Sequence, residues 1–282
     1  MEFLEIGLSE RERIEGIRRT VGHTASSHAF VSLYLWRHAM SLSVAYRGEA
    51  FLVKSGEGYF FPCGKSGDVL SLVAAVWECE PDAVFLYARA EDVALMRSVY
   101  GEGITAEFDA ASREYLYDRE EQIAMPGKPF TYQRAKVNKA RRLGETLSVE
   151  LTEAHRETAK AITRLWAERR EDEGDLAVTL EALDSMEALS LYGNLLLLDS
   201  QPIGFNLGSF LAPHIFDIHI AKTLRDDVDT LMKLELYKAL PERVTVINRE
   251  EDLGIRGLAI HKQDGKPSGF NDTYRIFSKG KE

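Results

Sequence analysis

One order of helices and strands occurs twice in this sequence of 282 residues, and it limits the possible folds more than any single motif does. In the second half, apolar periodicity predicts a strand, two helices, three consecutive strands, a helix, a strand, a helix and a last strand. These elements are expected at residues 147–151, 153–173, 180–189, 193–199, 203–211, 215–222, 226–240, 244–247, 253–262 and 273–277. The first of these helices has an apolar stripe formed by Ala159, Ile162, Leu165 and Trp166.

The first half of the chain repeats most of this order. Helices are expected at residues 9–19, 26–37, 68–78 and 91–100, and strands at 42–46, 50–54, 58–61, 83–87 and 104–108. Two halves with one element order predict tandem copies of a single α+β unit. We therefore expect an N-terminal domain of residues 1–125, a linking basic helix of residues 126–144 and a C-terminal domain of residues 145–282.

Composition excludes several classes of protein. The chain has 35 basic and 45 acidic side chains, a net charge of −10, which argues against DNA binding. It has two cysteines, so neither a disulfide framework nor a four-cysteine metal site is expected. No apolar run approaches the roughly 18 residues of a membrane-spanning helix, and the start Met-Glu-Phe-Leu-Glu lacks the basic region of a signal peptide. We expect a cytoplasmic protein without an integral membrane segment.

The repeated element order resembles the acyltransferase fold of the GCN5-related N-acetyltransferases. In that fold two neighbouring main strands separate at one edge. The gap exposes backbone N–H and C=O groups to an extended acyl-carrying arm, beside a helix N-terminus that receives phosphates. The resemblance implies two tandem domains of this kind, with mixed and mainly antiparallel sheets.

Six strings of residues carry a closer resemblance: Leu33-Tyr-Leu-Trp-Arg37, Tyr59-Phe-Phe-Pro-Cys-Gly-Lys-Ser-Gly-Asp68, Tyr115-Leu-Tyr117, Pro126-Gly-Lys128, Ile218-His-Ile-Ala-Lys222 and Val246-Ile-Asn-Arg-Glu-Glu-Asp-Leu-Gly254. They are similar to segments of the family named for the C-terminal domain of phosphatidylglycerol lysyltransferase. The resemblance implies a relationship to the Fem-type transferases, which move amino acids from aminoacyl-tRNA onto cell-wall peptides. Ala259 stands where that family usually carries arginine, and the membrane-spanning portion of its lipid-modifying members is not found in this sequence. The second departure argues against direct lysylation of phosphatidylglycerol.

The turns that could hold a donor phosphate differ between the two halves. Coenzyme A binding on this fold requires a glycine-rich turn between the third consecutive strand and the next helix. Residues 222–229 contain three aspartates and no glycine, which disfavours coenzyme A in the second half. In the first half, Gly64, Lys65 and Gly67 could cradle a phosphate. The alternative is a plain tight turn capped by Asp68.

A basic stretch at residues 128–142 contains six lysines and arginines and no acidic residue. On a helix, Arg134, Asn138 and Arg141 share one face. That face could bind tRNA, an anionic headgroup or another anionic small molecule. The alternative is a solvated helix whose charges are neutralised by nearby acidic side chains.

Asp217 and His219 are two residues apart on a predicted strand, so their side chains are expected on one face. His219 could act as the general base that removes a proton from an acceptor amine. The alternative is a structural hydrogen-bonded pair. No metal is expected, because His214 and His219 have no third ligand at a suitable spacing.

The remaining candidates cluster near the most specific string of the resemblance. Asn248 could orient an acyl carbonyl, and Asp252 could hold the amino group of a donor; the alternative for Asp252 is a helix cap. Lys222 could neutralise a carboxylate or a developing oxyanion, and Lys262 could contribute to substrate binding. Lys222, Asn248 and His219 are therefore predicted to be catalytic.

These observations lead to one function and two alternatives. We expect an acyl- or aminoacyltransferase that moves an activated acyl group to an amine or hydroxyl, with aminoacyl-tRNA favoured as donor over acyl-coenzyme A. No additional cofactor is expected. The first alternative is an acyl-coenzyme A-dependent N-acyltransferase that uses the turn from Gly64 to Gly67. The second is a non-catalytic module, a degenerate transferase that binds a ligand or partner.

Overall fold

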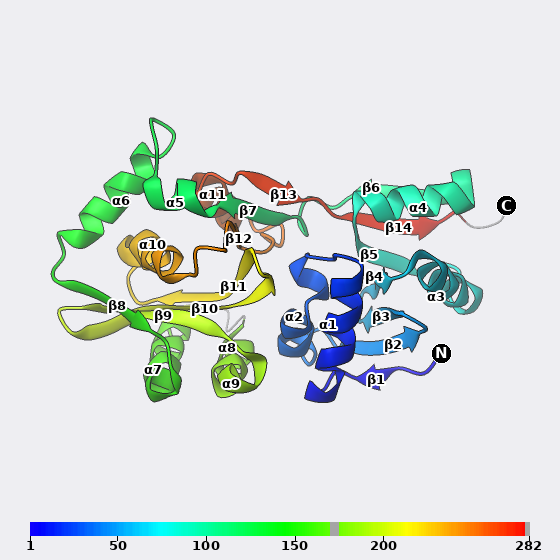
Figure 1. The fold of residues 1–282 in the computed structure, drawn as a ribbon, viewed down its shortest axis with the longest axis horizontal. Coiled ribbons are helices and arrows are strands. Elements are labelled where there is room, and N and C mark those ends of the chain that lie inside the picture. The colour runs from blue at the N-terminus through cyan, green and yellow to red at the C-terminus, as the bar shows by residue number, and fades with distance from the viewer. Residues whose placement is uncertain (170–174, 280–282) are drawn as a thin grey trace. The chain divides into compact units, whose positions relative to one another are not determined.

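A computed structural model describes residues 1–169 and 175–279 (Figure 1). The chain divides into two compact units. Unit 1 comprises residues 1–114, 251–256 and 270–282, and unit 2 comprises residues 115–250 and 257–269. Each unit contains one seven-stranded sheet, so the expected tandem α+β fold is confirmed.

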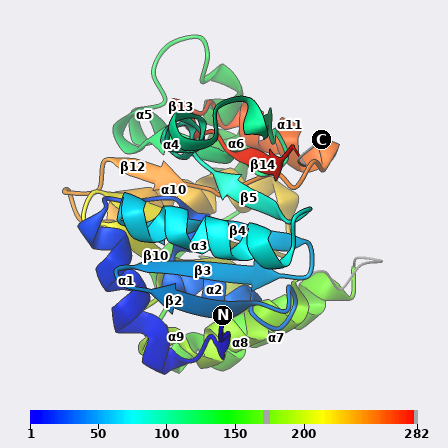
Figure 2. The same ribbon diagram turned by 90° about the vertical axis from the view of Figure 1, so that its right-hand side faces the viewer.

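The sheet of unit 1 has the strand order β1-β2-β3-β4-β5-β14-β6. Its strands are β1 (Leu4–Glu5), β2 (Ser43–Arg47), β3 (Ala50–Ser55), β4 (Gly58–Gly64), β5 (Val84–Ala88), β14 (Tyr274–Ser278) and β6 (Ile104–Phe108). Its α-helices are α1 (Arg11–Thr20), α2 (Phe30–Trp36), α3 (Ser66–Cys79) and α4 (Ala90–Tyr100), and its 3-10 turns are η1 (Leu8–Glu10), η2 (Ser26–His28) and η3 (Gly101–Gly103). Helices α1 and α2 lie on one face of the sheet and α3 on the other (Figures 1 and 2).

The core of unit 1 follows from the spacing of apolar residues in α3. Val69, Leu72, Val73 and Val76 recur at helical spacing and are all buried. They join a cluster that contains Phe85 of β5. Burial of such a stripe stabilises the pairing of helix and sheet by roughly 1.5–3 kcal/mol for each large side chain.

The sheet of unit 2 has the order β13-β7-β12-β11-β10-β9-β8. Its strands are β7 (Glu114–Asp118), β8 (Thr146–Glu150), β9 (Tyr192–Leu198), β10 (Gln201–Ala212), β11 (Ile215–Thr223), β12 (Val246–Asn248) and β13 (Gly269–Asn271). The helices are α5 (Arg119–Ala124), α6 (Thr131–Arg141), α7 (Arg156–Ala167), α8 (Leu176–Asp184), α9 (Met186–Leu189), α10 (Asp229–Ala239) and α11 (Arg256–Asp264), with 3-10 turns η4 (Glu153–His155) and η5 (Asp226–Val228). Helices α7, α8 and α9 lie on one face of this sheet, and α10 and α6 on the other (Figure 1).

The two halves exchange one strand each. Strand β14 comes from the C-terminal end of the sequence and pairs with β5 and β6 in the sheet of unit 1. Strand β7 comes from the first half of the sequence and pairs with β12 in the sheet of unit 2. The units therefore do not follow the predicted boundaries at residues 125 and 145: residues 115–125 belong to unit 2, and residues 270–282 belong to unit 1. Sequence periodicity identifies a strand but not the sheet that it joins.

Several helix boundaries also differ from those expected. Leu165 is exposed rather than part of the buried stripe of α7, in which Ala159 and Ile162 are buried. The segment expected as one helix at 180–189 consists of α8 and α9, and α11 begins at Arg256 rather than at residue 253. Residues 170–173, expected at the end of the helix that begins near residue 153, lie outside the described residues. Within the described part of the chain, no helix has the length and apolar character required to cross a membrane.

Both sheets contain the parallel strand pair whose separation the acyltransferase resemblance implies. In unit 1, β4 pairs with β5 only at Tyr59–Phe85 and Phe60–Leu86, although β4 continues to Gly64. In unit 2, β11 pairs with β12 from Ile215 to Asp217, although β11 continues to Thr223. Tyr87 and Glu250, which follow the last pairs, have φ values of 57° and 57°. This left-handed backbone is unfavourable for non-glycine residues, and it turns both strands away from their neighbours.

Candidate active site

Aromatic rings lie beside the point in unit 1 where the pairing of β4 with β5 ends. The backbone carbonyl oxygen of Phe61 lies 2.8 Å from Nε2 of His28, and the rings of Phe60 and Tyr87 are 4.6 Å apart between centroids. Burial lowers the pKa of His28 to about 3, so this ring is neutral at physiological pH. The backbone group that a guest chain would use is therefore already hydrogen-bonded.

The gap in unit 2 has a different, polar lining. Strand β11 has one extra residue, His219, between the pairs Leu207–Ile220 and Gly208–Ile218. This β-bulge shifts the alternation of the strand by one residue. Lys222 therefore lies on the same sheet face as Asp217, which pairs with Ser209 of β10 and with Asn248 of β12. The bulge thus gathers polar side chains from three strands on one face.

His219 is the centre of this polar group. Its Nδ1 atom lies 2.8 Å from Oε1 of Glu250 and 3.4 Å from Oδ2 of Asp217, and its Nε2 atom lies 2.8 Å from Oγ of Ser209. Burial alone would lower the pKa of His219, but the charges of Asp217 and Glu250 outweigh it and raise the pKa above its ordinary value. The predicted proximity of Asp217 and His219 is confirmed, and Glu250 and Ser209 are partners that the sequence analysis missed.

The carboxylates of Asp217 and Glu250 and the imidazole of His219 are side-chain groups of the kinds that bind metal ions. One ligand atom from each of Asp217, His219 and Glu250 lies within 4.8 Å of the others. Glu250 is 31 residues from His219 in sequence, so residue spacing alone could not identify it as a third ligand. A proton on Nδ1, shared between two carboxylates, accounts for the same distances, so the geometry fits either occupant of this position.

Lys222 is buried at the end of β11. Its Nζ atom lies 2.5 and 2.8 Å from the two carboxylate oxygens of Asp175, and 3.5 Å from the centroid of the Trp166 ring. These contacts hold its ammonium group in place. Its predicted role in neutralising a substrate carboxylate or oxyanion stays a prediction.

Three other predicted residues have contacts that shape the backbone. Asn248 is fully buried, and its Oδ1 atom accepts a hydrogen bond from the backbone N–H of Glu250 at 2.8 Å. Lys262 donates to the backbone oxygen of Arg249 at 2.5 Å. Asp252 belongs to unit 1 and accepts a hydrogen bond from the N–H of Gly254 at 2.9 Å, in a turn that precedes α11. Asn248 therefore supports the strained backbone that places Glu250 against His219.

The basic stretch forms α6 as predicted, but its residues differ in availability. Arg134 donates to the backbone oxygens of Met125 and Gly127 and to Oγ1 of Thr131, so it closes the loop before its own helix. Arg141 lies 3.4 Å from a carboxylate oxygen of Glu235, and Asn138 is exposed. Anion binding by this helix stays a prediction.

The hydrogen bonds that Arg134 makes to the preceding loop predict that its removal destabilises the folded protein. A role in anion binding alone would not predict this loss. Arg134→Ala should lower the free energy of unfolding by about 1–3 kcal/mol, because it removes hydrogen bonds from a charged donor to backbone oxygens. Urea denaturation measures this change. Asn138→Ala, an exposed change on the same helix, should stay within about 0.5 kcal/mol of the parent. Equal stability of the two variants would contradict a structural role for Arg134.

The glycine turn of unit 1 has a packing explanation. Gly64 has φ of 152°, and a Cβ atom there would lie 2.4 Å from the Cα of Ala50 on β3. Lys65 forms an ion pair with Glu49, and Gly67 lies in open space in the first turn of α3. Asp68 accepts a hydrogen bond from the N–H of Glu49 at 2.9 Å instead of capping its helix. Phosphate binding at Gly64, Lys65 and Gly67 stays a prediction.

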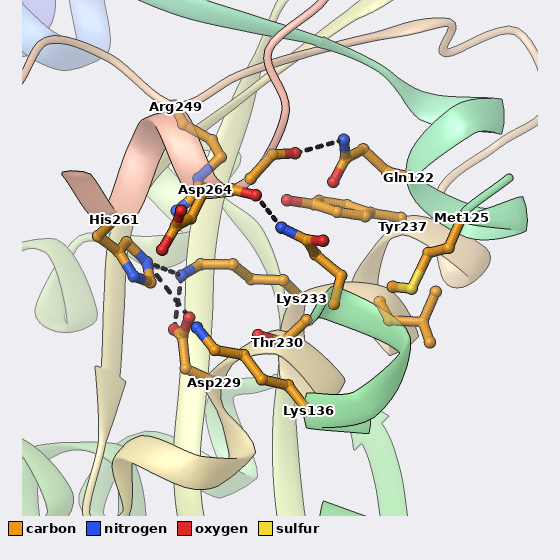
Figure 3. Close-up of a pocket in the computed structure, with 13 residues that line it drawn as sticks. Gln122, Met125, Lys136, Asp229, Thr230, Lys233, Tyr237, Arg249, His261 and Asp264 are labelled. Carbon is orange, nitrogen blue, oxygen red and sulfur yellow. Dashed lines mark hydrogen bonds and ion pairs between the residues drawn. The ribbon is translucent and has the colours of Figure 1, made fainter. Parts of the chain in front are cut away.

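A second charged cluster lies within unit 2, on the side of the sheet covered by α10 (Figure 3). Lys233 and Asp229, one turn apart on α10, approach to 2.5 Å, and Nε2 of His261 lies 3.4 Å from each. Burial lowers the pKa of Lys233 to about 8 despite the charge of Asp229. The space between these residues and Arg249 is about 30 Å³, enough for one or two water molecules. This cluster is too small for an acyl donor, and it ties α10 to α11.

The repeated strand order and the separated parallel strands define the class of this protein: it has the tandem acyltransferase-type fold of the GNAT-like proteins. The sequence model for "Phosphatidylglycerol lysyltransferase, C-terminal" matches residues 18–277. The chain therefore belongs to that family. No curated protein sequence matches the chain.

Solved structures with this fold span nearly the whole chain. A conserved protein of unknown function from Bacteroides thetaiotaomicron is 23% identical, with a TM-score of 0.90 over 99% of this chain and 100% of that one. L-PGS from Bacillus licheniformis is 15% identical, with a TM-score of 0.66 over 96% of this chain and 92% of that one. FemX is 10% identical, with a TM-score of 0.60 over 98% of this chain and 97% of that one. At these identities the likeness establishes the fold.

Proposed function

We propose that the protein transfers an activated acyl group, in particular an aminoacyl group, to an amine or hydroxyl acceptor at the gap in unit 2. The observation that carries this proposal is the position of His219 at the point where β11 loses its pairing with β12. An extended acyl-carrying arm could pair with the open edge of β11, and its carbonyl would then lie beside a buried imidazole.

His219 would act as the general base in this reaction. A neutral imidazole accepts the proton that the acceptor amine or hydroxyl loses as it attacks the acyl carbon. Glu250 and Asp217 orient the ring through Nδ1 and stabilise the imidazolium that forms. Lys222 would bind the charged end of the substrate, a role that Asp175 could modulate.

An aminoacyl ester is a better donor for this gap than acyl-coenzyme A. The turn after β11 contains Asp226, Asp227 and Asp229, and its segment offers no glycine to approach a pyrophosphate. Asp227 is paired with Arg225, with two nitrogen–oxygen distances of 3.1 Å, so the cation of this turn is already occupied. Membership of a family named for a lysyltransferase supports the same choice.

The test is a transfer assay on purified protein with two kinds of donor. Charged tRNA and acyl-coenzyme A are each supplied with amine and hydroxyl acceptors, and acylated acceptor is measured. The proposal expects product from charged tRNA. Absence of product with both donors would contradict the proposal and favour the alternative of a non-catalytic binding module. A thermal-shift screen with tRNA and anionic headgroups would detect such a module, because a bound ligand increases the stability of the protein.

The pH dependence of transfer tests the role of His219. Because the base must be neutral, activity should rise with pH through the raised pKa of His219. Glu250→Gln removes one of the two charges that raise this pKa, so the inflection should move to lower pH. A pH–rate profile of both proteins measures the shift. An unchanged inflection in the variant would show that another group titrates.

A further inference from the structure

Ser209 completes a hydroxyl–imidazole–carboxylate arrangement in unit 2. Its Oγ atom lies 2.8 Å from Nε2 of His219, and Nδ1 of the same ring lies 2.8 Å from Oε1 of Glu250. The three residues come from β10, from the bulge of β11 and from the turn after β12. Such a nucleophile, base and orienting acid within hydrogen-bond distance is the geometric signature of nucleophilic catalysis.

The position of the protons favours an activated hydroxyl. Nδ1 of His219 faces two carboxylates, those of Glu250 and Asp217, and so carries a proton. In the neutral ring Nε2 is then an acceptor, and the Ser209 hydroxyl donates to it. Among the described residues, this is the sole hydrogen bond of that hydroxyl. A serine with a purely structural role more often bonds a backbone carbonyl in its own neighbourhood.

The local backbone explains why these groups meet. Ser209 is paired with Asp217 across the β10–β11 ladder, and its side chain would normally face that residue. The bulge places His219 in β11 between two ladder pairs, and Nε2 of its ring lies 2.8 Å from Oγ of Ser209. Bulges of this kind re-aim side chains next to active sites. His219 is two residues from Asp217, so its ring lies on the same sheet face as Asp217 and Ser209.

We propose that Ser209 is a catalytic nucleophile that carries the acyl group between donor and acceptor; this inference rests on the proposed transfer function. Oγ of Ser209 attacks the carbonyl carbon of an aminoacyl ester, and its proton passes to Nε2 of His219. The bond between the carbonyl carbon and the ester oxygen breaks, and the leaving alkoxide takes the proton from His219. An amine or hydroxyl then attacks the acyl-serine by the same steps in reverse order, and Ser209 regains its proton.

A small serine-directed reagent tests the nucleophile without any natural substrate. Ser209 is only about 5% exposed, so the probe must be small. Suitable probes are p-nitrophenyl acetate and a short-chain alkyl fluorophosphonate. The full-length protein should gain one adduct, assigned to Ser209 by peptide mass spectrometry. Ser209→Ala and His219→Asn should lower the rate of adduct formation at least about 100-fold, whereas Ser71→Ala, at a half-buried serine on α3, should leave it unchanged.

The Ser209→Cys variant tests whether misfolding, rather than loss of the nucleophile, explains a lower rate of adduct formation. If the site is intact, its thiol should form the acetyl adduct with p-nitrophenyl acetate, and His219→Asn in that background should slow the reaction. No adduct on either wild type or Ser209→Cys, with thermal unfolding unchanged, would overturn the inference. So would transfer at an unchanged rate by Ser209→Ala. Failure of the proposed function is a different result, namely an adduct on Ser209 without transfer from any donor.

Discussion

Replacing His219 by asparagine is expected to slow acyl transfer by about 10²–10⁴-fold, which is the usual contribution of a positioned general base. Asparagine retains a polar side chain of similar reach but cannot accept and release a proton at neutral pH. The loss should appear in kcat more than in KM, because His219 acts on the reacting proton rather than on substrate binding. Steady-state kinetics with aminoacylated donor and a fixed acceptor measure both constants.

A matched control exists on the same hairpin. His214 is exposed in the turn between β10 and β11, five residues before His219. His214→Asn makes the same chemical change outside the site and should retain the parental rate. A rate that falls equally in both variants, or in neither, would contradict the role given to His219.

Replacing Lys233 by methionine is expected to lower the free energy of unfolding by about 3–5 kcal/mol, the usual effect of removing one partner of a buried ion pair. Asp229 would keep its negative charge in a largely enclosed position and would retain its contact with His261. Figure 3 shows how the two side chains meet between α10 and α11. Urea or thermal denaturation at pH 7 measures the loss.

The double variant Asp229→Asn/Lys233→Met distinguishes the effect of losing the ion pair from the effect of leaving the Asp229 charge unpaired. It should recover much of the free energy of unfolding that Lys233→Met loses. The pH dependence gives a second check. Burial would raise the pKa of Asp229, but Lys233 and His261 outweigh it and hold the pKa well below its ordinary value. The stabilisation from the pair is therefore present above the ordinary carboxyl range and is lost as pH falls. A deficit of Lys233→Met that grows in acid would contradict this account.

The element order of the fold could be predicted from the sequence because it depends on local periodicity. The ends of the strands β9, β10 and β11 and of the helix α3 lie within one or two residues of their expected positions. No strand was expected at the position of β7, and the exchange of β14 could not be predicted, since a strand of five residues carries no signal for the sheet that it joins. The domain boundaries failed for the same reason.

The candidate site was predicted in part. Alternation along a strand placed Asp217 beside His219, and the Asn248–Glu250 string drew attention to the turn that supplies Glu250. Ser209 was missed because its pairing with Asp217 depends on the register between β10 and β11, and nothing in the local sequence marks that register. Gly208, one residue before Ser209, was the available signal: a Cβ there would lie 2.0 Å from the Asp217 carbonyl oxygen, so only glycine allows this close approach.

The difference between the two units also has a physical basis. In unit 1 the rings of His28, Phe60 and Tyr87 lie beside the separated strands, whereas in unit 2 ionisable side chains gather where the pairing of β11 with β12 ends. A duplicated fold thus carries an apolar, hydrogen-bonded gap in one copy and a charged gap in the other. We therefore propose the transfer chemistry for unit 2.

The most direct measurement is a crystal structure of the protein with a non-hydrolysable amide analogue of the aminoacyl ester. The proposal predicts the amide carbonyl carbon within about 3–3.5 Å of Ser209 Oγ, with the analogue lying along the open edge of β11 beyond Asp217. An analogue bound instead in the gap of unit 1, or against α10 beside Lys233, would contradict the assignment of the transfer site.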